Sequence, residues 1–378
     1  MTSPSWPAVN ARRLAQHGLA RPFPSGTAVA EVAAAVSGVH AQVLSAAEVS
    51  TALRVEGATR DDVRRALWED RTLVKTFGPR GTVHLLPAAD LGRWMAALGA
   101  LPWRSAFPDG VRLTDDETRT VVAAIGEALR GRDLTVDELT EAIGDLAGAW
   151  AAEPVMPAFQ TLWPRWRQVT DRAAYAGVLC YGPDRARKVT YARPPDADPV
   201  EPDAAVEWAI EQYLRSYGPA TPASFAPWFG STPAWAAERM AAHPTLVRVE
   251  LDGEQAYDLP GAAYDGPPAE GVRLLPYFDA YVVGSRPRHL LFPGRARERA
   301  LVPSGQAGNY PVLLVDGEVA GVWHQKRSGR RVAITVEPLS RLSAARLAQL
   351  DEQVARVGAI VDAEATLTIG PVSVGPHA

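Results

Sequence analysis

Residues 72–86 read TLVKTFGPRGTVHLL, in which two short apolar and β-branched runs flank Gly78-Pro79-Arg80-Gly81. This arrangement is typical of a β-hairpin. Three helical segments precede it, at residues 27–36, 45–54 and 59–70, after an opening helix at 8–19. Three short helices followed by a hairpin are the ingredients of a winged helix-turn-helix.

The same order of elements occurs twice more along the chain. In the second repeat, helices are expected at 114–130, 135–146 and 158–167, followed by a hairpin whose strands, 177–181 and 188–193, flank a turn at Gly182-Pro183-Asp184-Arg185. In the third, helices at 203–217, from 221 and from 232 to about 242 precede a hairpin with an Asp252-Gly253 turn. Asp-Gly between alternating apolar residues is a strong hairpin signal.

The remainder, residues 271–378, is predicted to hold strands and one helix after Ser340 or Ser343. We therefore expect an α+β protein of three tandem winged helix-turn-helix units and a C-terminal β-rich segment with one helix. The expected boundaries are 1–108, 109–200, 201–265 and 266–378, with an N-terminal helix and the loop at residues 38–42 in the first unit and a basic hairpin in the last.

The amino-acid composition excludes several classes of protein. The 378 residues are 47% hydrophobic and 22% charged, as in an ordinary globular protein with buried cores. The one cysteine, Cys180, excludes a disulfide framework and a multi-thiolate zinc site, and it is predicted to be a buried small hydrophobe. Neither a signal peptide nor an apolar run of membrane-spanning length is visible, so we expect a cytoplasmic protein. We also expect it to be a monomer.

Positive charge is concentrated locally although the net charge is −4. Residues 286–331 hold nine basic and three acidic side chains, and Lys326, Arg327, Arg330 and Arg331 lie at an expected hairpin tip. Arginines on a narrow hairpin can enter a DNA groove or bind phosphates. Arg185 and Arg187 repeat the pattern more weakly in the second hairpin. The alternative is a pair of charged turns exposed to solvent.

A search for catalytic motifs excludes several enzyme classes. The seven histidines form no HExxH pair, and the chain has no Walker A loop, GxSxG elbow or GxGxxG after a strand, so neither a metal nor another cofactor is expected. One short segment, Gly38-Val39-His40-Ala41-Gln42, remains. In an extended segment, residues i and i+2 point the same way, so His40 and Gln42 could converge on one water molecule. The alternative is an ordinary loop.

Four stretches together resemble one family. They are residues 38–42 (GVHAQ), 66–85 (ALWEDRTLVKTFGPRGTVHL), 213–222 (YLRSYGPATP) and 273–279 (RLLPYFD). In combination they resemble the AlkZ-like winged-helix DNA glycosylases, which include the YcaQ-like proteins, and the resemblance spans nearly the whole chain.

The resemblance implies tandem winged helices around double-stranded DNA and excision of alkylated purines, notably N7-alkylguanine adducts and crosslinks. It also implies self-resistance as a role in antibiotic-producing bacteria. The catalytic motif of the family is Gln-x-Gln or Gln-x-Asp, and some members carry His-x-Gln. Gln42 matches the second glutamine, whereas His40 replaces the first. The DNA-probing hairpin of the family maps to Lys326–Arg331, and His84 in the first wing is a further candidate DNA contact.

Three tryptophans, Trp163, Trp166 and Trp323, are candidates for stacking on a flipped base, although core packing is the stronger expectation for each. Without the family resemblance, the residues are also compatible with two other functions. A transcriptional regulator would use the same wings and arginines without needing His40, and an interaction module would show no salt-dependent affinity for DNA.

Overall fold

The computed structural model describes residues 3–102, 107–158 and 161–376. Contacts divide the chain into two compact units. Unit 1 comprises Met1–Glu69 and Ile210–Ala378, and unit 2 comprises Asp70–Ala209. Helix α10 (Pro202–Tyr217) crosses the boundary between them. No described helix has both the length and the apolar character needed to cross a membrane.

Unit 1 opens with short helices and closes with a sheet. Its N-terminal elements are α1 (Trp6–Gln16), α2 (Val29–Ala35), β1 (Val39–His40), α3 (Leu44–Ala52) and α4 (Arg60–Trp68). After α10 come α11 (Pro222–Phe229), α12 (Pro233–Ala242), β9 (Val247–Leu251), β10 (Glu254–Asp258), β11 (Val272–Leu275), α13 (Ala280–Gly284), α14 (Arg288–Leu291) and α15 (Arg295–Ala300). The last elements are β12 (Val312–Val315), β13 (Glu318–Ser328), β14 (Arg331–Pro338), α16 (Ala344–Ile360) and β15 (Glu364–Ile369).

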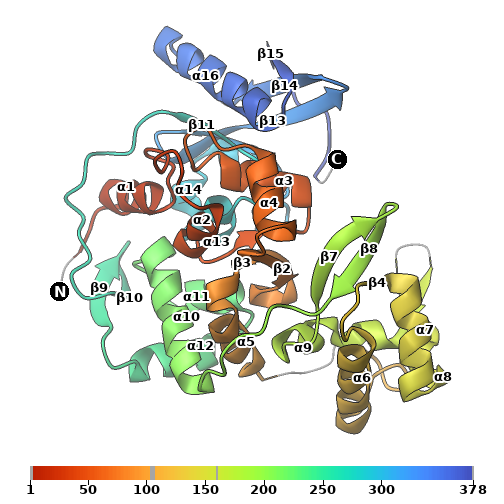
Figure 1. Ribbon diagram of the computed structural model, residues 1–378. Helices are drawn as coiled ribbons and strands as arrows, with labels where there is room; N and C mark the ends of the chain where they lie inside the picture. Colours follow the sequence, from red (N-terminus) through yellow and green to blue (C-terminus); the bar gives the residue numbers. More distant parts are fainter. Residues whose placement is uncertain (1–2, 103–106, 159–160, 377–378) are drawn as a thin grey trace. The chain divides into compact units, whose positions relative to one another are not determined.

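A five-stranded sheet in the order β11-β12-β13-β14-β15 organises unit 1. Its strands are antiparallel except for β14 and β15, which run parallel because α16 carries the chain back between them. Neighbouring side chains alternate between two apolar layers. Leu313 and Trp323 pack with α3 and α16, whereas Leu314 and Val322 pack with α1 and α13–α15. Figure 1 shows α16 lying along β13 and β14.

Unit 2 contains a second, smaller core. Its elements are β2 (Leu73–Phe77), β3 (Val83–Pro87), α5 (Leu91–Gly99), α6 (Asp115–Ala128), β4 (Leu134–Thr135), α7 (Val136–Ala147), α8 (Ala149–Ala152), β5 (Pro154–Pro157), β6 (Leu162–Pro164), α9 (Thr170–Tyr175), β7 (Cys180–Arg185) and β8 (Lys188–Ala192), with short 3-10 turns at Pro79–Gly81, Ala88–Asp90 and Arg165–Val169. Apolar side chains of α6, α7 and α9 surround the buried Trp166.

Most helices and hairpins were predicted correctly from local signals in the sequence. The hairpins β2–β3, β7–β8 and β9–β10 are all present. Thr59, Thr114 and Thr135 each form a capping box with an acidic residue three positions later. Asp252 and Gly253 both have positive φ, at 54° and 76°, as a tight hairpin turn requires.

Three expectations from the sequence were wrong. No helix spans 158–167: of the described residues there, Leu162–Pro164 form β6 and a 3-10 turn starts at Arg165, while residues 159–160 lie outside the described part. Pro157 and Pro164 interrupt helical hydrogen bonding, so the helix forms later, at α9.

The turn of the β7–β8 hairpin is also displaced. Gly182–Arg185 belong to β7 with a bulge, and the chain reverses at Ala186 and Arg187, which both have positive φ. The C-terminal segment holds more than one helix, since α13, α14 and α15 precede α16. These three are only four to six residues long, too short for periodicity to reveal.

A buried ion pair joins the turn after α3 to the turn before α13. Arg54 donates to both carboxylate oxygens of Asp279, at 2.9 and 2.8 Å, and both side chains are fully inaccessible to solvent. Ser50 donates to the same carboxylate at 2.7 Å, and the backbone N–H of Tyr281 donates to it at 3.0 Å. Burial opposes ionisation, but these partners hold the pKa of Asp279 below its ordinary value.

Removing one partner of this pair should destabilise the protein strongly. Asp279→Ala leaves the Arg54 guanidinium buried without its counter-charge, which costs about 3–5 kcal/mol in comparable buried pairs. Urea unfolding of the full chain measures the loss. The double variant Arg54→Leu, Asp279→Ala should lose less than the sum of the two single variants, and strictly additive losses would contradict the coupling.

His17 should make unfolding depend on pH. It is fully buried beside Arg54, with Nε2 3.1 Å from the Ser216 carbonyl oxygen, and burial lowers its pKa to about 3. Between pH 6.5 and 3 the unfolded chain binds a proton that folded His17 does not. The free energy of unfolding should therefore fall as pH falls, by up to about 1.4 kcal/mol per unit from this group. His17→Gln should lose this contribution, whereas an unchanged pH profile would contradict it.

Candidate active site

The loop between α2 and α3 carries both predicted catalytic residues. His40 ends the short strand β1 and is only 7% exposed, and its neighbours Val39 and Ala41 are also buried. Gln42 lies two residues further on, in a bend before α3, and is exposed to solvent. The loop therefore combines a nearly enclosed imidazole with an accessible amide. Their convergence on one water molecule stays a prediction.

Helix α10 holds the start of this loop. The chain leaves α2 through Ser37 and Gly38, which have φ of 59° and 93°. The hydroxyl of Ser37 lies 2.7 Å from that of Ser216, which also donates to the Ala35 carbonyl at 2.9 Å. The hydroxyl of Tyr217 reaches the Val36 carbonyl at 3.1 Å. These contacts join the stretch 213–222 to the start of the GVHAQ loop, although the two are far apart in sequence.

Phe278 packs directly on His40. The two rings are stacked, with centroids 4.8 Å apart and planes inclined by 26°. Phe278 has φ of 54°, an uncommon conformation for a bulky residue. Its N–H donates to the Gly308 carbonyl at 2.8 Å, and a Cβ on Gly308 would approach the Phe278 Cα to 3.1 Å. The adjacent Asp279 is bonded to Arg54, so the ring that orients His40 is itself fixed.

Three residues of the site, Phe278, Asp279 and Arg54, were not predicted from the sequence to have a role. Phe278 and Asp279 lie in the quoted stretch 273–279, and an aspartate before a short helix is a visible capping signal. Arg54 carries no such signal, because its partner is 225 positions away.

The predicted DNA contacts lie in three places. Lys326, Arg327, Arg330 and Arg331 are all exposed around the tip of β13–β14, where only Arg331 approaches an acid, Glu364, at 3.8 Å. Arg185 and Arg187 are exposed at the β7–β8 tip, where Arg185 pairs with Glu138. His84 differs, since it is 4% exposed and its Nδ1 lies 2.8 Å from the Thr82 carbonyl oxygen.

The three candidate tryptophans are not equivalent. Trp166 and Trp323 are buried at 0% and 1% exposure, and their N–H groups bond to Thr140 and to the Leu275 carbonyl, so core packing is confirmed for both. Trp163 is 42% exposed, and the guanidinium of Arg167 lies 3.9 Å from its ring centroid.

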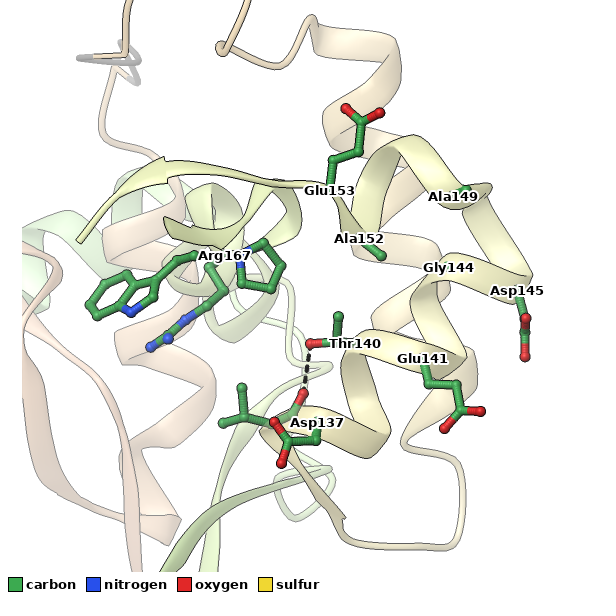
Figure 2. A pocket seen from close by; sticks show the side chains of 12 residues that line it. Asp137, Thr140, Glu141, Gly144, Asp145, Ala149, Ala152, Glu153 and Arg167 are labelled. Carbon is green, nitrogen blue, oxygen red and sulfur yellow. Dashed lines mark hydrogen bonds between the residues drawn. The ribbon is translucent and has the colours of Figure 1, made fainter. Parts of the chain in front are cut away.

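Trp163 lines a pocket of about 750 Å³ in unit 2. Figure 2 shows Thr140, Gly144 and Ala152 around the hollow, with the carboxylates of Asp145 and Glu153 pointing away from it. Asp137 and Glu141 are the other acidic residues of its wall, and Arg167 is the basic one. Neither His40 nor Gln42 belongs to this wall, and its negative charge does not suit DNA phosphates.

Comparisons with known proteins agree on one family. The model of the AlkZ-like DNA glycosylases matches residues 33–360. An interstrand DNA cross-link repair glycosylase from Streptomyces sahachiroi is 32% identical over 346 residues, covering 84% of this chain and 87% of that protein. The solved structure of the Streptomyces sahachiroi DNA glycosylase AlkZ has a TM-score of 0.79 at 26% identity, covering 98% of this chain and 100% of that one. The chain therefore belongs to the AlkZ-like family of DNA glycosylases, hydrolases that cleave N-glycosyl bonds.

Proposed function

We propose that this glycosylase removes alkylated purines, chiefly N7-alkylguanine, from double-stranded DNA as a monomer. Bulky adducts and crosslinks are included in the proposal, because the Streptomyces sahachiroi relative is described as a cross-link repair enzyme. The observation that carries the proposal is His40, nearly enclosed and stacked on Phe278, in the same loop as Gln42. DNA repair or self-resistance is the role that this chemistry would serve.

The reaction needs little acid catalysis. An N7-alkylated guanine is already cationic, so the electron pair of the breaking C1′–N9 bond neutralises the departing base. The sugar passes through an oxocarbenium-like state, and a water oxygen then bonds to C1′. Positioning that water supplies much of the rate enhancement. The products are the free base and an abasic site, without a covalent enzyme adduct.

We assign the two motif residues separate roles in this step. A neutral His40 accepts the proton that the attacking water loses. The amide of Gln42 binds the same water and keeps it in register with the sugar, since its oxygen accepts and its nitrogen donates hydrogen bonds. Phe278 fixes the plane of the imidazole, so that one edge of His40 faces the reacting water.

We further propose that the three repeats are winged helices that contact the duplex. In the second repeat, the sheet order β4-β8-β7 supports this interpretation, because the strand before the second helix pairs with the second strand of the wing. The exposed arginines of the β7–β8 and β13–β14 tips are suited to bind DNA phosphates.

Substitution of either motif residue should abolish most base release. A duplex carrying one N7-methylguanine, and a matched duplex with a bulky N7 adduct, are incubated with each variant, and strand scission after mild alkali reports the abasic site. His40→Ala and Gln42→Ala should slow release by about 10²–10⁴-fold, the range for loss of a general base or its partner. His40→Gln restores the Gln-x-Gln pattern of the family and should retain more activity than His40→Ala.

Ser45→Ala provides the matched control, because Ser45 is exposed at the start of α3, in the same segment. Its release rate should equal that of the wild type. Full activity in both motif variants would overturn the assigned roles. Borohydride treatment during turnover should trap no protein–DNA adduct, whereas a trapped adduct would show a lyase and contradict the proposed hydrolysis.

The β13–β14 tip should contribute to DNA affinity through charge. Arg327→Ala with Arg330→Ala should weaken binding to an undamaged duplex and lower the slope of log K against log salt by about 2, one for each phosphate contact. The control replaces Arg119 on α6 and Arg130 in the turn after it, both of which are exposed and pair with Asp116 and Glu127, respectively. Equal slopes in both double variants would show that the hairpin does not touch phosphate.

A further inference from the structure

A basic pocket in unit 1 lies outside the predicted site. It has a volume of about 470 Å³ and lies among α11, β10 and the short helices α14 and α15. Three arginines contribute to its wall, Arg286, Arg288 and Arg297, together with hydroxyl-bearing Thr221, Ser224 and Ser304. His40, Gln42 and the arginines of the two hairpin tips are not part of it.

Arg286 is the feature that points to a ligand. Its side chain is partly buried, and this burial lowers its pKa. Among residues 3–102, 107–158 and 161–376, no carboxylate lies within 4 Å of its guanidinium, and no hydrogen bond from its side chain is present. Burying a cation is costly unless an opposite charge compensates it. The geometry therefore leaves room for an anion that the chain itself does not supply.

The other two arginines strengthen the positive charge. Arg288 donates to the carbonyls of Val283 and Ser285 at 2.7 and 2.9 Å, which orient its guanidinium at the pocket wall. Arg297 is exposed on α15, and the described residues offer it no ion pair. Glu254 is the acidic residue of the wall, so the pocket keeps a net positive charge.

The fourth basic group, His289, is directed elsewhere. Its Nε2 lies 2.9 Å from a carboxylate oxygen of Asp252, at the β9–β10 turn. The positive charge available to a ligand therefore comes from the arginines, whose planar forks match the oxygens of a phosphate better than a lysine does. Serine and threonine hydroxyls can donate to the remaining phosphate oxygens.

We propose that this pocket binds a phosphate group through Arg286, Arg288 and Arg297. Two sources share this chemistry: a phosphodiester of the DNA backbone, or a free phosphate such as that of a nucleotide. If the phosphate belongs to DNA, this proposal rests on the part of the proposed function in which the chain binds duplex DNA. Neither source requires that the protein release a base.

The test compares three variants of the full chain. Arg297→Ala removes an exposed arginine of the pocket, and Arg286→Met removes the partly buried one while keeping an unbranched side chain. Arg295→Ala is the matched control: Arg295 lies on the same helix α15, reaches the Leu339 carbonyl at 3.3 Å and is not part of the pocket wall. All three should keep the wild-type melting temperature in chloride buffer, and if Arg286→Met does not fold, Arg297→Ala carries the test.

The first measurement is the salt dependence of binding to an undamaged duplex. Arg297→Ala and Arg286→Met should each lower the slope of log K against log salt by about 1, and Arg295→Ala should leave it unchanged. The second is the rise in melting temperature on replacing chloride by inorganic phosphate at equal ionic strength, which should be smaller in the two pocket variants.

The outcomes separate the two sources. A reduced slope assigns the pocket to the DNA backbone, whereas a lost phosphate response with an unchanged slope assigns it to a free phosphate ligand. Unchanged slope and unchanged phosphate response in the pocket variants would overturn the proposal. Because the duplex carries no lesion, a failure of His40 and Gln42 to catalyse base release would leave these measurements unaffected.

Discussion

The ion pair between Arg54 and Asp279 is the interaction on which the candidate site depends. It joins two segments next to the predicted catalytic loop. Arg54 lies in the turn after α3, the helix that follows the loop, and Asp279 follows the ring that stacks on His40. A buried ion pair adds little net stability, because desolvation offsets the Coulombic attraction. The pair nevertheless requires a specific geometry, because the Asp279 carboxylate accepts hydrogen bonds from Arg54, from Ser50 and from a backbone N–H of α13 at the same time. The pair thus determines which arrangement of the two segments is allowed.

The same arrangement explains a strained residue beside the site. Phe278 is held at positive φ by Gly308 on one side and by the anchored Asp279 on the other. Strain of this kind persists only where surrounding contacts over-determine it. Here the result is a fixed aromatic surface against which the imidazole of His40 stacks. A rigid base would suit the reaction that we propose, in which the leaving group is already charged and placement of the water sets the rate.

Charge is organised locally in this protein. The chain is acidic overall, yet the tips of two hairpins and one pocket of unit 1 are basic, while the larger pocket of unit 2 has a mainly acidic wall. Net charge therefore says little about which surfaces meet a polyanion. With three lysines in the chain, almost every positive contact is made by arginine. The planar guanidinium can bind phosphate in a bidentate manner, but it can also bind a buried carboxylate within the fold, as Arg54 does.

The elements whose signals are local could be predicted from the sequence. Capping boxes at Thr59, Thr114 and Thr135 and the Asp252-Gly253 turn depend on residues a few positions apart, and so does the family motif at 38–42. The stacking of Phe278 on His40, the Arg54–Asp279 ion pair and the basic pocket are visible only in the tertiary structure. The first two contacts join residues more than 200 positions apart in the sequence. Neither periodicity nor residue spacing can predict such contacts, because they depend on how distant segments pack together.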